Sequence, residues 1–121
     1  MLQKYTILNK EEKEVILEKG TERAFSGLYY DNNEKGTYLC KQCNTPLFTS
    51  ESKFDSGTGW PSFDDMIEQN VTEVADKDGM RVEIICTNCN AHLGHVFKSE
   101  GFTNKQTRHC VNSISLNFSK K

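Results

Sequence analysis

The chain has 121 residues, the size of a single compact domain, and we expect one domain over residues 1–121. Its 15 Lys and Arg residues against 17 Asp and Glu residues give a net charge of −2, which disfavours binding to nucleic acid through a basic surface. Apolar runs are only a few residues long, which argues against a membrane-spanning segment. The first residues, MLQKYTILNKEEKEV, lack the apolar core of a signal peptide, and we therefore expect a cytoplasmic protein.

A short helix is predicted near the start of the chain, over residues 9–20. Asn9 is a good N-cap, Glu12 stands at the capping-box position, and Gly20 follows the expected helix end. After Thr37 the chain consists of short segments rich in Val, Ile, Phe, Tyr and Thr, separated by Gly, Asn and Asp. This pattern predicts a mainly β protein with a helical N-terminal segment.

Three later segments have distinct patterns. Residues 71–75 and 80–85 flank the turn sequence DKDG, which predicts a hairpin. Residues 111–118 alternate apolar and polar side chains, which predicts a half-buried strand. Residues 53–63 contain two glycines and have neither a strand nor a helix pattern.

The cysteine spacing predicts a metal site. Two C-x2-C pairs, Cys40 with Cys43 and Cys86 with Cys89, are separated by 42 residues. Two such knuckles can close a tetrahedral site of four thiolates, so we expect one structural Zn²⁺ ion that leaves no position open for water. Two disulfides, a redox C-x-x-C motif and iron in the same cage are the alternatives.

Cys110 lies outside these knuckles. With the period of a strand it shares a face with Arg108 and Asn112, followed by apolar residues. A nearby guanidinium favours the thiolate and lowers the pKa of a cysteine, which would make Cys110 reactive; a buried, inert cysteine is the alternative. The opposite face is expected to be turned to solvent, and it comprises His109, Val111, Ser113, Ser115 and Asn117.

The remaining candidates are histidines and the single tryptophan. His92 and His95 follow the second knuckle, and because four thiolates already complete the metal site, we expect them to act as acid or base near Cys110. Ordinary hydrogen bonding is their alternative role. His109 is given no chemical role. Trp60 is either a plug in the core or the wall of a pocket for a small apolar group.

Together these stretches resemble the methionine sulfoxide reductase B family. The resemblance covers residues 20–118 and is carried by both knuckles and by the stretches GTERAFSG, KFDSGTGWPSF, AHLGHVF and RHCVNS. It implies two antiparallel sheets, a structural zinc and reduction of the R epimer of methionine sulfoxide. By position, it implies that Cys110 is the nucleophile, His92 and His95 are the active-site histidines, Arg108 and Asn112 are supporting polar groups, and Trp60 is the wall that binds the methyl group.

The chemistry that this resemblance implies begins with attack of Cys110 on the sulfoxide sulfur. His95 is expected to be the main proton donor, with His92 and Asn112 holding the oxygen or a water, and Cys110 ends as a sulfenic acid. The expected substrates are oxidised proteins and small or free sulfoxides, and the protein is expected to be a monomer.

The chain departs from many family members at two positions. Thr58 stands where many members have a resolving cysteine, so an external thiol such as thioredoxin is expected to reduce the sulfenic acid. Ser99 stands where many have an acidic residue, with Glu100 next to it, which removes an expected carboxylate partner of the histidines. The rival readings are a zinc-knuckle binding module without catalysis and a thiol peroxidase.

Overall fold

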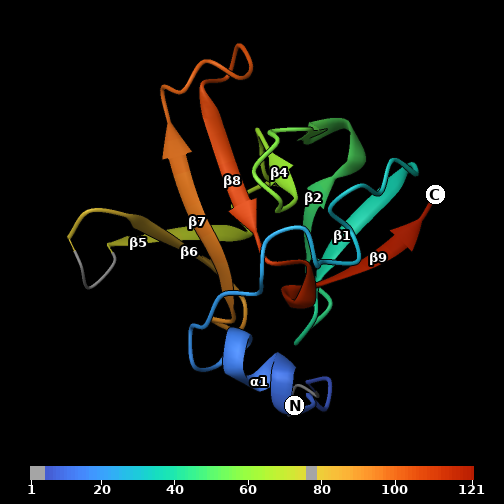
Figure 1. Ribbon diagram of the computed structural model, residues 1–121. Helices are drawn as coiled ribbons and strands as arrows, with labels where there is room; N and C mark the ends of the chain where they lie inside the picture. Colours follow the sequence, from blue (N-terminus) through green and yellow to red (C-terminus); the bar gives the residue numbers. More distant parts are fainter. Residues whose placement is uncertain (1–4, 76–78) are drawn as a thin grey trace.

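The computed structural model describes residues 5–75 and 79–121 (Figure 1). Within these ranges the secondary structure consists of one α-helix, nine short strands and two 3₁₀ turns. The helix is α1 (Lys10–Ile16) and the 3₁₀ turns are η1 (Ser50–Ser52) and η2 (Ser113–Ser115). The strands are β1 (Gly36–Cys40), β2 (Pro46–Thr49), β3 (Lys53–Phe54), β4 (Ser62–Phe63), β5 (Val71–Ala75), β6 (Val82–Cys86), β7 (His92–Lys98), β8 (Thr107–Val111) and β9 (Leu116–Lys120).

The strands form two antiparallel sheets, as expected. One sheet has the order β2-β1-β9 and the other the order β3-β4-β8-β7-β6-β5. The predicted hairpin is confirmed by the pairing of β5 with β6, and its turn residues 76–78 lie outside the described residues. In Figure 1 the long β7–β8 pair stands at the centre, with β1, β2 and β9 on one side and β5 and β6 on the other.

Aromatic side chains join the two sheets. Phe48 on β2 stacks on Phe63 of β4 with ring centroids 4.3 Å apart, and Tyr38 on β1 meets Phe63 edge-on at 5.0 Å. All three side chains are fully buried. Since large aromatic rings remove much apolar surface from water, this cluster holds the sheets against each other.

The N-terminal helix is shorter than predicted. The capping box is confirmed, because the Asn9 side chain accepts from the Glu12 N–H and the Glu12 side chain accepts from the Asn9 N–H. The helix ends at Ile16, however, and Lys19 adopts a left-handed backbone conformation with φ of 60°. The chain therefore turns back before Gly20, whose N–H donates to the Glu14 carbonyl.

Two strand expectations were wrong. The stretch 111–118 is not one strand, because η2 interrupts it between β8 and β9, and the side expected to face solvent is largely buried: His109, Val111, Ser113 and Ser115 are each at most 4% exposed. The stretch 53–63 is not simply a loop, since its ends form β3 and β4, which pair with each other. In the second stretch, residues 61–63 are buried, whereas residues 53–58 are exposed or partly exposed. No helix among the described residues is long and apolar enough to cross a membrane.

Candidate active site and metal-binding cluster

Cys110 lies on β8 between two neighbouring strands. In the strand register it stands opposite His95 of β7 and opposite Ser62 of β4. The approach of β7 is unusually close, since a Cβ atom added to Gly94 would lie 1.9 Å from the Cys110 carbonyl oxygen. Glycine is therefore required at this position, and it sets the distance between the strands that carry the thiol and the imidazole.

A cavity of about 170 Å³ opens at this point. It brings together Cys110, His95, Trp60, Arg108 and Asn112, all of which the sequence singled out. The remaining lining residues are Thr21, Thr58, Arg81, Gly94 and Phe97. An indole, an imidazole and a thiol facing one small cavity can bind a compact group and supply both a nucleophile and an acid to it.

His92 lies beside this cavity rather than on its wall. It is buried, its Nδ1 is 2.7 Å from Glu83 Oε2, and its ring centroid is 5.7 Å from that of His95. Its Nε2 has no hydrogen-bond partner among the described residues. The geometry gives His92 contact with the second histidine and with Glu83, and not with the cavity that holds Cys110.

Glu83 is the buried carboxylate that supports this histidine. Its side chain also accepts from Lys19 Nζ at 3.1 Å. Burial raises the pKa of Glu83, but the hydrogen bonds from His92 and Lys19 outweigh burial and leave the pKa below its ordinary value. Burial lowers the pKa of His92, against the opposing effect of Glu83. A neutral His92 that donates from Nδ1 to the Glu83 carboxylate accounts for both directions.

Arg108 is held firmly at the other side of the cavity. Its Nε donates to Glu100 Oε1 at 2.8 Å, and its guanidinium carbon lies 4.5 Å from the centre of the Phe97 ring. Glu100 therefore supports the arginine and not the histidines, whose carboxylate comes from β6 instead. The thiol also differs from expectation: burial raises the pKa of Cys110, and Arg108 only partly offsets this. Cys110 therefore rests as a thiol near neutral pH.

Thr58 lies in the same cavity as Cys110. Its hydroxyl is 2.7 Å from that of Ser56, which is in turn 2.9 Å from that of Ser62, the register partner of Cys110. A chain of hydroxyl groups thus occupies the position where the family resemblance led us to look for a second thiol.

Sequence reasoning assigned no role to three carboxylates near the cavity. Glu83 and Glu100 are described above, and the third, Glu22, contacts residues about ninety positions further along the chain. Their only local signal was the occurrence of an acidic residue in a polar segment, which is common on any protein surface. Their partners became visible only when the strands were paired.

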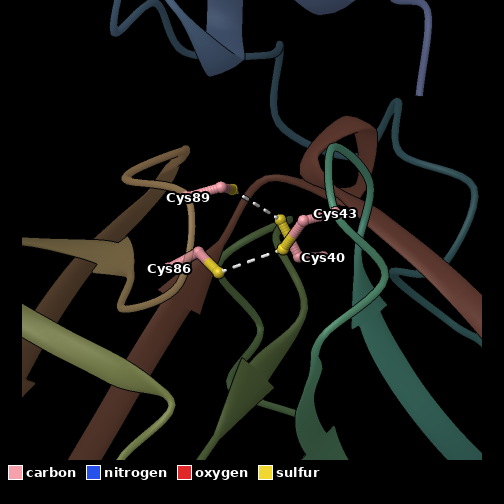
Figure 2. A group of neighbouring side chains, drawn as sticks. All are labelled: Cys40, Cys43, Cys86 and Cys89. Carbon is pink, nitrogen blue, oxygen red and sulfur yellow. Dashed lines mark hydrogen bonds between the residues drawn. The ribbon is translucent and has the colours of Figure 1, made fainter. Parts of the chain in front are cut away.

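The four knuckle cysteines form a tight cluster (Figure 2). Cys40 ends β1 and Cys86 ends β6, while Cys43 and Cys89 lie in the turns that follow these strands. All four Sγ atoms lie within 4.8 Å of one another. The Sγ atoms of Cys40 and Cys89 are 3.5 Å apart, and those of Cys43 and Cys86 are 3.6 Å apart. These distances are far too long for disulfides, and a tetrahedral zinc site with Zn–S bonds of about 2.3 Å requires about 3.8 Å between its sulfur atoms. The cluster could therefore bind a metal ion.

The comparison with known proteins decides the family. A model of the SelR domain matches residues 8–120. The chain belongs to this family. Among its relatives, peptide methionine sulfoxide reductase MsrB of Teredinibacter turnerae is 52% identical over 117 residues, covering 94% of this chain and 86% of the relative. The resemblance inferred from the motifs is thereby confirmed.

Two further relatives are also named peptide methionine sulfoxide reductases. Peptide methionine sulfoxide reductase MsrB of Methanosarcina mazei is 44% identical over 119 residues, covering 96% of this chain and 84% of the relative. Peptide methionine sulfoxide reductase B2, chloroplastic, of Arabidopsis thaliana is 50% identical over 113 residues, covering 93% of this chain. The chain spans 56% of the length of that plant relative and 64% of the length of the Arabidopsis reductase B3.

Proposed function

We propose that this SelR domain reduces the R epimer of methionine sulfoxide, in oxidised proteins and in small or free substrates. The observation that carries the proposal is the placement of Cys110 opposite His95 in a cavity walled by Trp60. A thiol, a titratable donor and a flat apolar surface are the three groups that this reaction needs. The names of the relatives support the same reaction.

The proposed reaction moves one oxygen atom from the substrate to Cys110. The Cys110 sulfur attacks the sulfoxide sulfur and forms an S–S bond, while the S–O bond of the substrate breaks and its protonated oxygen leaves as hydroxide. Hydroxide then attacks the Cys110 sulfur, which forms the new S–O bond on Cys110, breaks the S–S bond and releases the thioether. His95 takes the thiol proton and delivers it to the oxygen, so that thiol plus sulfoxide gives sulfenic acid plus thioether, with two electrons passing from the cysteine to the substrate. A thiol with a raised pKa needs such an acceptor, since it is protonated before the reaction.

Selection of the R epimer follows from fixing three groups at once. The methyl group packs on the Trp60 indole, the oxygen points toward His95, and the rest of the side chain leaves through the cavity mouth. The opposite epimer, with its methyl on Trp60, would turn its oxygen away from the imidazole. Arg108 and Asn112 complete the polar side of this pocket, and His92 supports His95 from behind.

We further propose that the cysteine cluster holds one structural zinc ion. Hydrogen bonds from Cys40 and Cys86 lower the pKa of Cys89, whereas hydrogen bonds with Cys86 and Cys89 raise the pKa of Cys40, so binding of zinc would displace the remaining thiol protons. Four thiolates would complete the coordination and would join the β1–β2 turn to the β6–β7 turn.

Recycling is proposed to use an external thiol. The cavity presents Thr58 and not a second thiol beside Cys110, so the sulfenic acid is attacked by thioredoxin or by another thiol reductant. None of the five cysteines forms a disulfide, which suits a reducing compartment, and we propose the cytoplasm.

The test is turnover of separate R and S methionine sulfoxide with a thiol reductant, using the wild type and Cys110→Ser. We expect reduction of the R epimer alone and none in the variant, while metal content and the melting temperature stay unchanged. Activity that survives in Cys110→Ser would reject the mechanism. Peroxide reduction without sulfoxide reduction would favour a thiol peroxidase, and neither activity would favour a binding module.

A further inference from the structure

The segment that follows α1, residues 20–28, has no role in the chemistry described so far. In Figure 1 it passes in front of the ends of β7 and β8 before it reaches β1. It is attached to the tryptophan loop, since the Phe25 N–H donates to the Gly59 carbonyl at 2.7 Å. One residue of this segment, Glu22, makes four hydrogen bonds to groups that are distant in the sequence.

The side chain of Glu22 caps the turn that follows Cys110. Its Oε2 accepts from the Ser113 N–H at 2.5 Å and its Oε1 from the Ile114 N–H at 3.2 Å. These are N–H groups of the first residues of η2, which have no partner within the turn, and the residue before it, Asn112, provides no side-chain cap. A carboxylate from a distant segment thus satisfies both donors.

The main chain of Glu22 holds two side chains of the cavity. Its N–H donates to Asn112 Oδ1 at 3.1 Å, and its carbonyl accepts from Trp60 Nε1 at 3.0 Å. The amide nitrogen of Asn112 donates in turn to the Leu93 carbonyl, so both ends of this amide are fixed. The indole and the amide therefore take their positions from the main chain of one residue.

Close packing prevents this segment from shifting on η2. A Cβ atom added to Gly27 would lie 2.3 Å from Ser113 Oγ and 2.7 Å from Glu22 Oε2. The Ser113 hydroxyl also accepts from the Tyr29 N–H at 3.2 Å. The carboxylate of Glu22 thus lies half-buried between η2 and its own segment.

We propose that Glu22 is a positioning residue: its carboxylate anchors residues 20–28 on η2, and the anchored main chain fixes Trp60 and Asn112 for the substrate. The effect on substrate rests on the function proposed above. The effect on Trp60 does not, because the indole is held in the absence of any ligand. Glu22 itself does not line the cavity that holds Cys110.

The single tryptophan makes this testable without substrate. We would compare the wild type with Glu22→Ala, Glu22→Gln and the control Glu51→Gln, which makes the same charge change at an exposed position in η1. In Glu22→Ala we expect emission of Trp60 at longer wavelength and stronger quenching by acrylamide. We also expect faster hydrogen exchange at the amides of Ser113 and Ile114. Glu22→Gln keeps one good acceptor, so its Trp60 emission, its quenching and its exchange rates should lie between those of the wild type and Glu22→Ala. Glu51→Gln should match the wild type in all three measurements.

Turnover separates positioning from a general loss of structure. In Glu22→Ala, kcat/KM for the R sulfoxide should fall about tenfold, the size expected for lost hydrogen bonds to a charged acceptor. The alkylation rate of Cys110 should not fall, since burial and Arg108 have the largest effects on its pKa and the charge of Glu22 has a smaller effect that raises it. Trp60→Phe removes the indole donor. Glu22→Ala should therefore lower kcat/KM less in the Trp60→Phe background than in the wild type.

Unchanged emission and quenching in Glu22→Ala would overturn the proposal. If that variant does not fold, Glu22→Gln decides, and wild-type emission together with wild-type exchange at Ser113 would overturn it. A spectral shift in a protein that reduces no sulfoxide would reject the proposed function but support the positioning of Trp60. Conversely, if the wild type reduces the R sulfoxide and the Trp60 emission of Glu22→Ala is unshifted, the proposed function is supported and the positioning role of Glu22 is rejected.

Discussion

His95 and Cys110 stand directly opposite each other on β7 and β8, as register partners of an antiparallel pair. Side chains at such positions project from the same face of a sheet, with Cβ atoms about 4.5–5.5 Å apart. The imidazole therefore reaches the space above the thiol without any movement of a loop. His92, three residues earlier, lacks this relationship and lies against Glu83.

This difference predicts distinct effects for the two histidines. His95→Ala should lower kcat by about 10²–10⁴-fold, the usual contribution of a positioned acid or base, and remove one limb of the pH–rate profile. His92→Ala should mainly reduce stability, because it leaves the buried Glu83 carboxylate without its closest partner. Steady-state kinetics across pH, together with denaturant unfolding, would measure both. A larger loss of kcat in His92→Ala, with unchanged stability, would exchange the two roles.

Gly94→Ala should be damaging although it adds a single methyl group. The added carbon would lie 1.9 Å from the Cys110 carbonyl oxygen, so β7 must move away from β8. We expect a loss of at least about 1–3 kcal/mol in stability and a fall in kcat as His95 withdraws from the thiol. Gly79→Ala is the control, because its Cβ would meet nothing within 4 Å and only its left-handed backbone, with φ of 70°, opposes the change. Equal kcat in the two variants would contradict the role given to Gly94.

Replacing a knuckle cysteine should act on the metal and not on the chemistry. Cys86→Ser is expected to lose the bound ion and to lower the melting temperature strongly, since structural metal contributes directly to folding free energy. Cys110→Ser is the matched control and should keep both. Elemental analysis with thermal melts would decide the matter, and it would also separate zinc from iron. Metal-free protein that melts like the wild type would show that the cluster does not support the fold.

Acid should destabilise the protein in two stages around the Glu83–His92 pair. An unfolded imidazole takes up a proton near pH 6.5, whereas the buried His92 resists it, so stability falls as the pH drops below about 6.5. The buried His109, whose pKa is also lowered, adds to this stage. Glu83 has a lowered pKa, so its contribution is present above its unfolded value and is lost as the pH falls through its folded value.

Glu83→Gln isolates the second stage. We expect it to cost about 1.5–3 kcal/mol at pH 7, as for a lost hydrogen bond to a charged group, and to flatten the decline below about pH 4.5. Denaturant unfolding at a series of pH values would measure this, with Glu51→Gln as the control. A pH profile identical to that of the wild type would exclude Glu83 as the source.

Recycling can be tested in a single turnover. Stoichiometric sulfoxide without reductant should leave a sulfenic acid on Cys110 that a dimedone-type reagent traps, with the metal retained. Mass spectrometry of the intact protein and of its peptides would show this. An internal disulfide between Cys110 and a knuckle cysteine, with release of the ion, would contradict both the external route and a purely structural metal.

Local patterns predicted the parts of this protein that depend on neighbouring residues. The capping box at Asn9 and Glu12 and the β5–β6 hairpin each involve residues close together in sequence, and their spacing carries the information. The residues facing the cavity were found through motif resemblance. The supporting carboxylates were not, because Glu22 meets Ser113 across about ninety residues, a contact that no spacing rule contains.

The break between β8 and β9 shows that a contact between distant residues can also interrupt a strand that the local pattern predicts. Residues 111–118 alternate like a strand, yet η2 forms there because Glu22 accepts from its first N–H groups and the Ser115 N–H donates to the Asn112 carbonyl. A tertiary contact therefore overrides a local preference. This turn redirects the chain from one sheet to the other, which the apparent period of two could not indicate.

The cysteine cluster has a consequence for how the chain reaches its structure. Its two pairs are separated by 42 residues, so bringing them together in an unfolded chain costs about 3 kcal/mol of entropy. A metal ion bound to one cysteine pair would offset this entropy loss when it binds the second pair. The β1–β2 turn would then lie beside the β6–β7 turn before the sheets are complete. Newly made chains in a metal-poor cell would then collapse more slowly, and the same sequence would be exposed longer to aggregation and proteolysis.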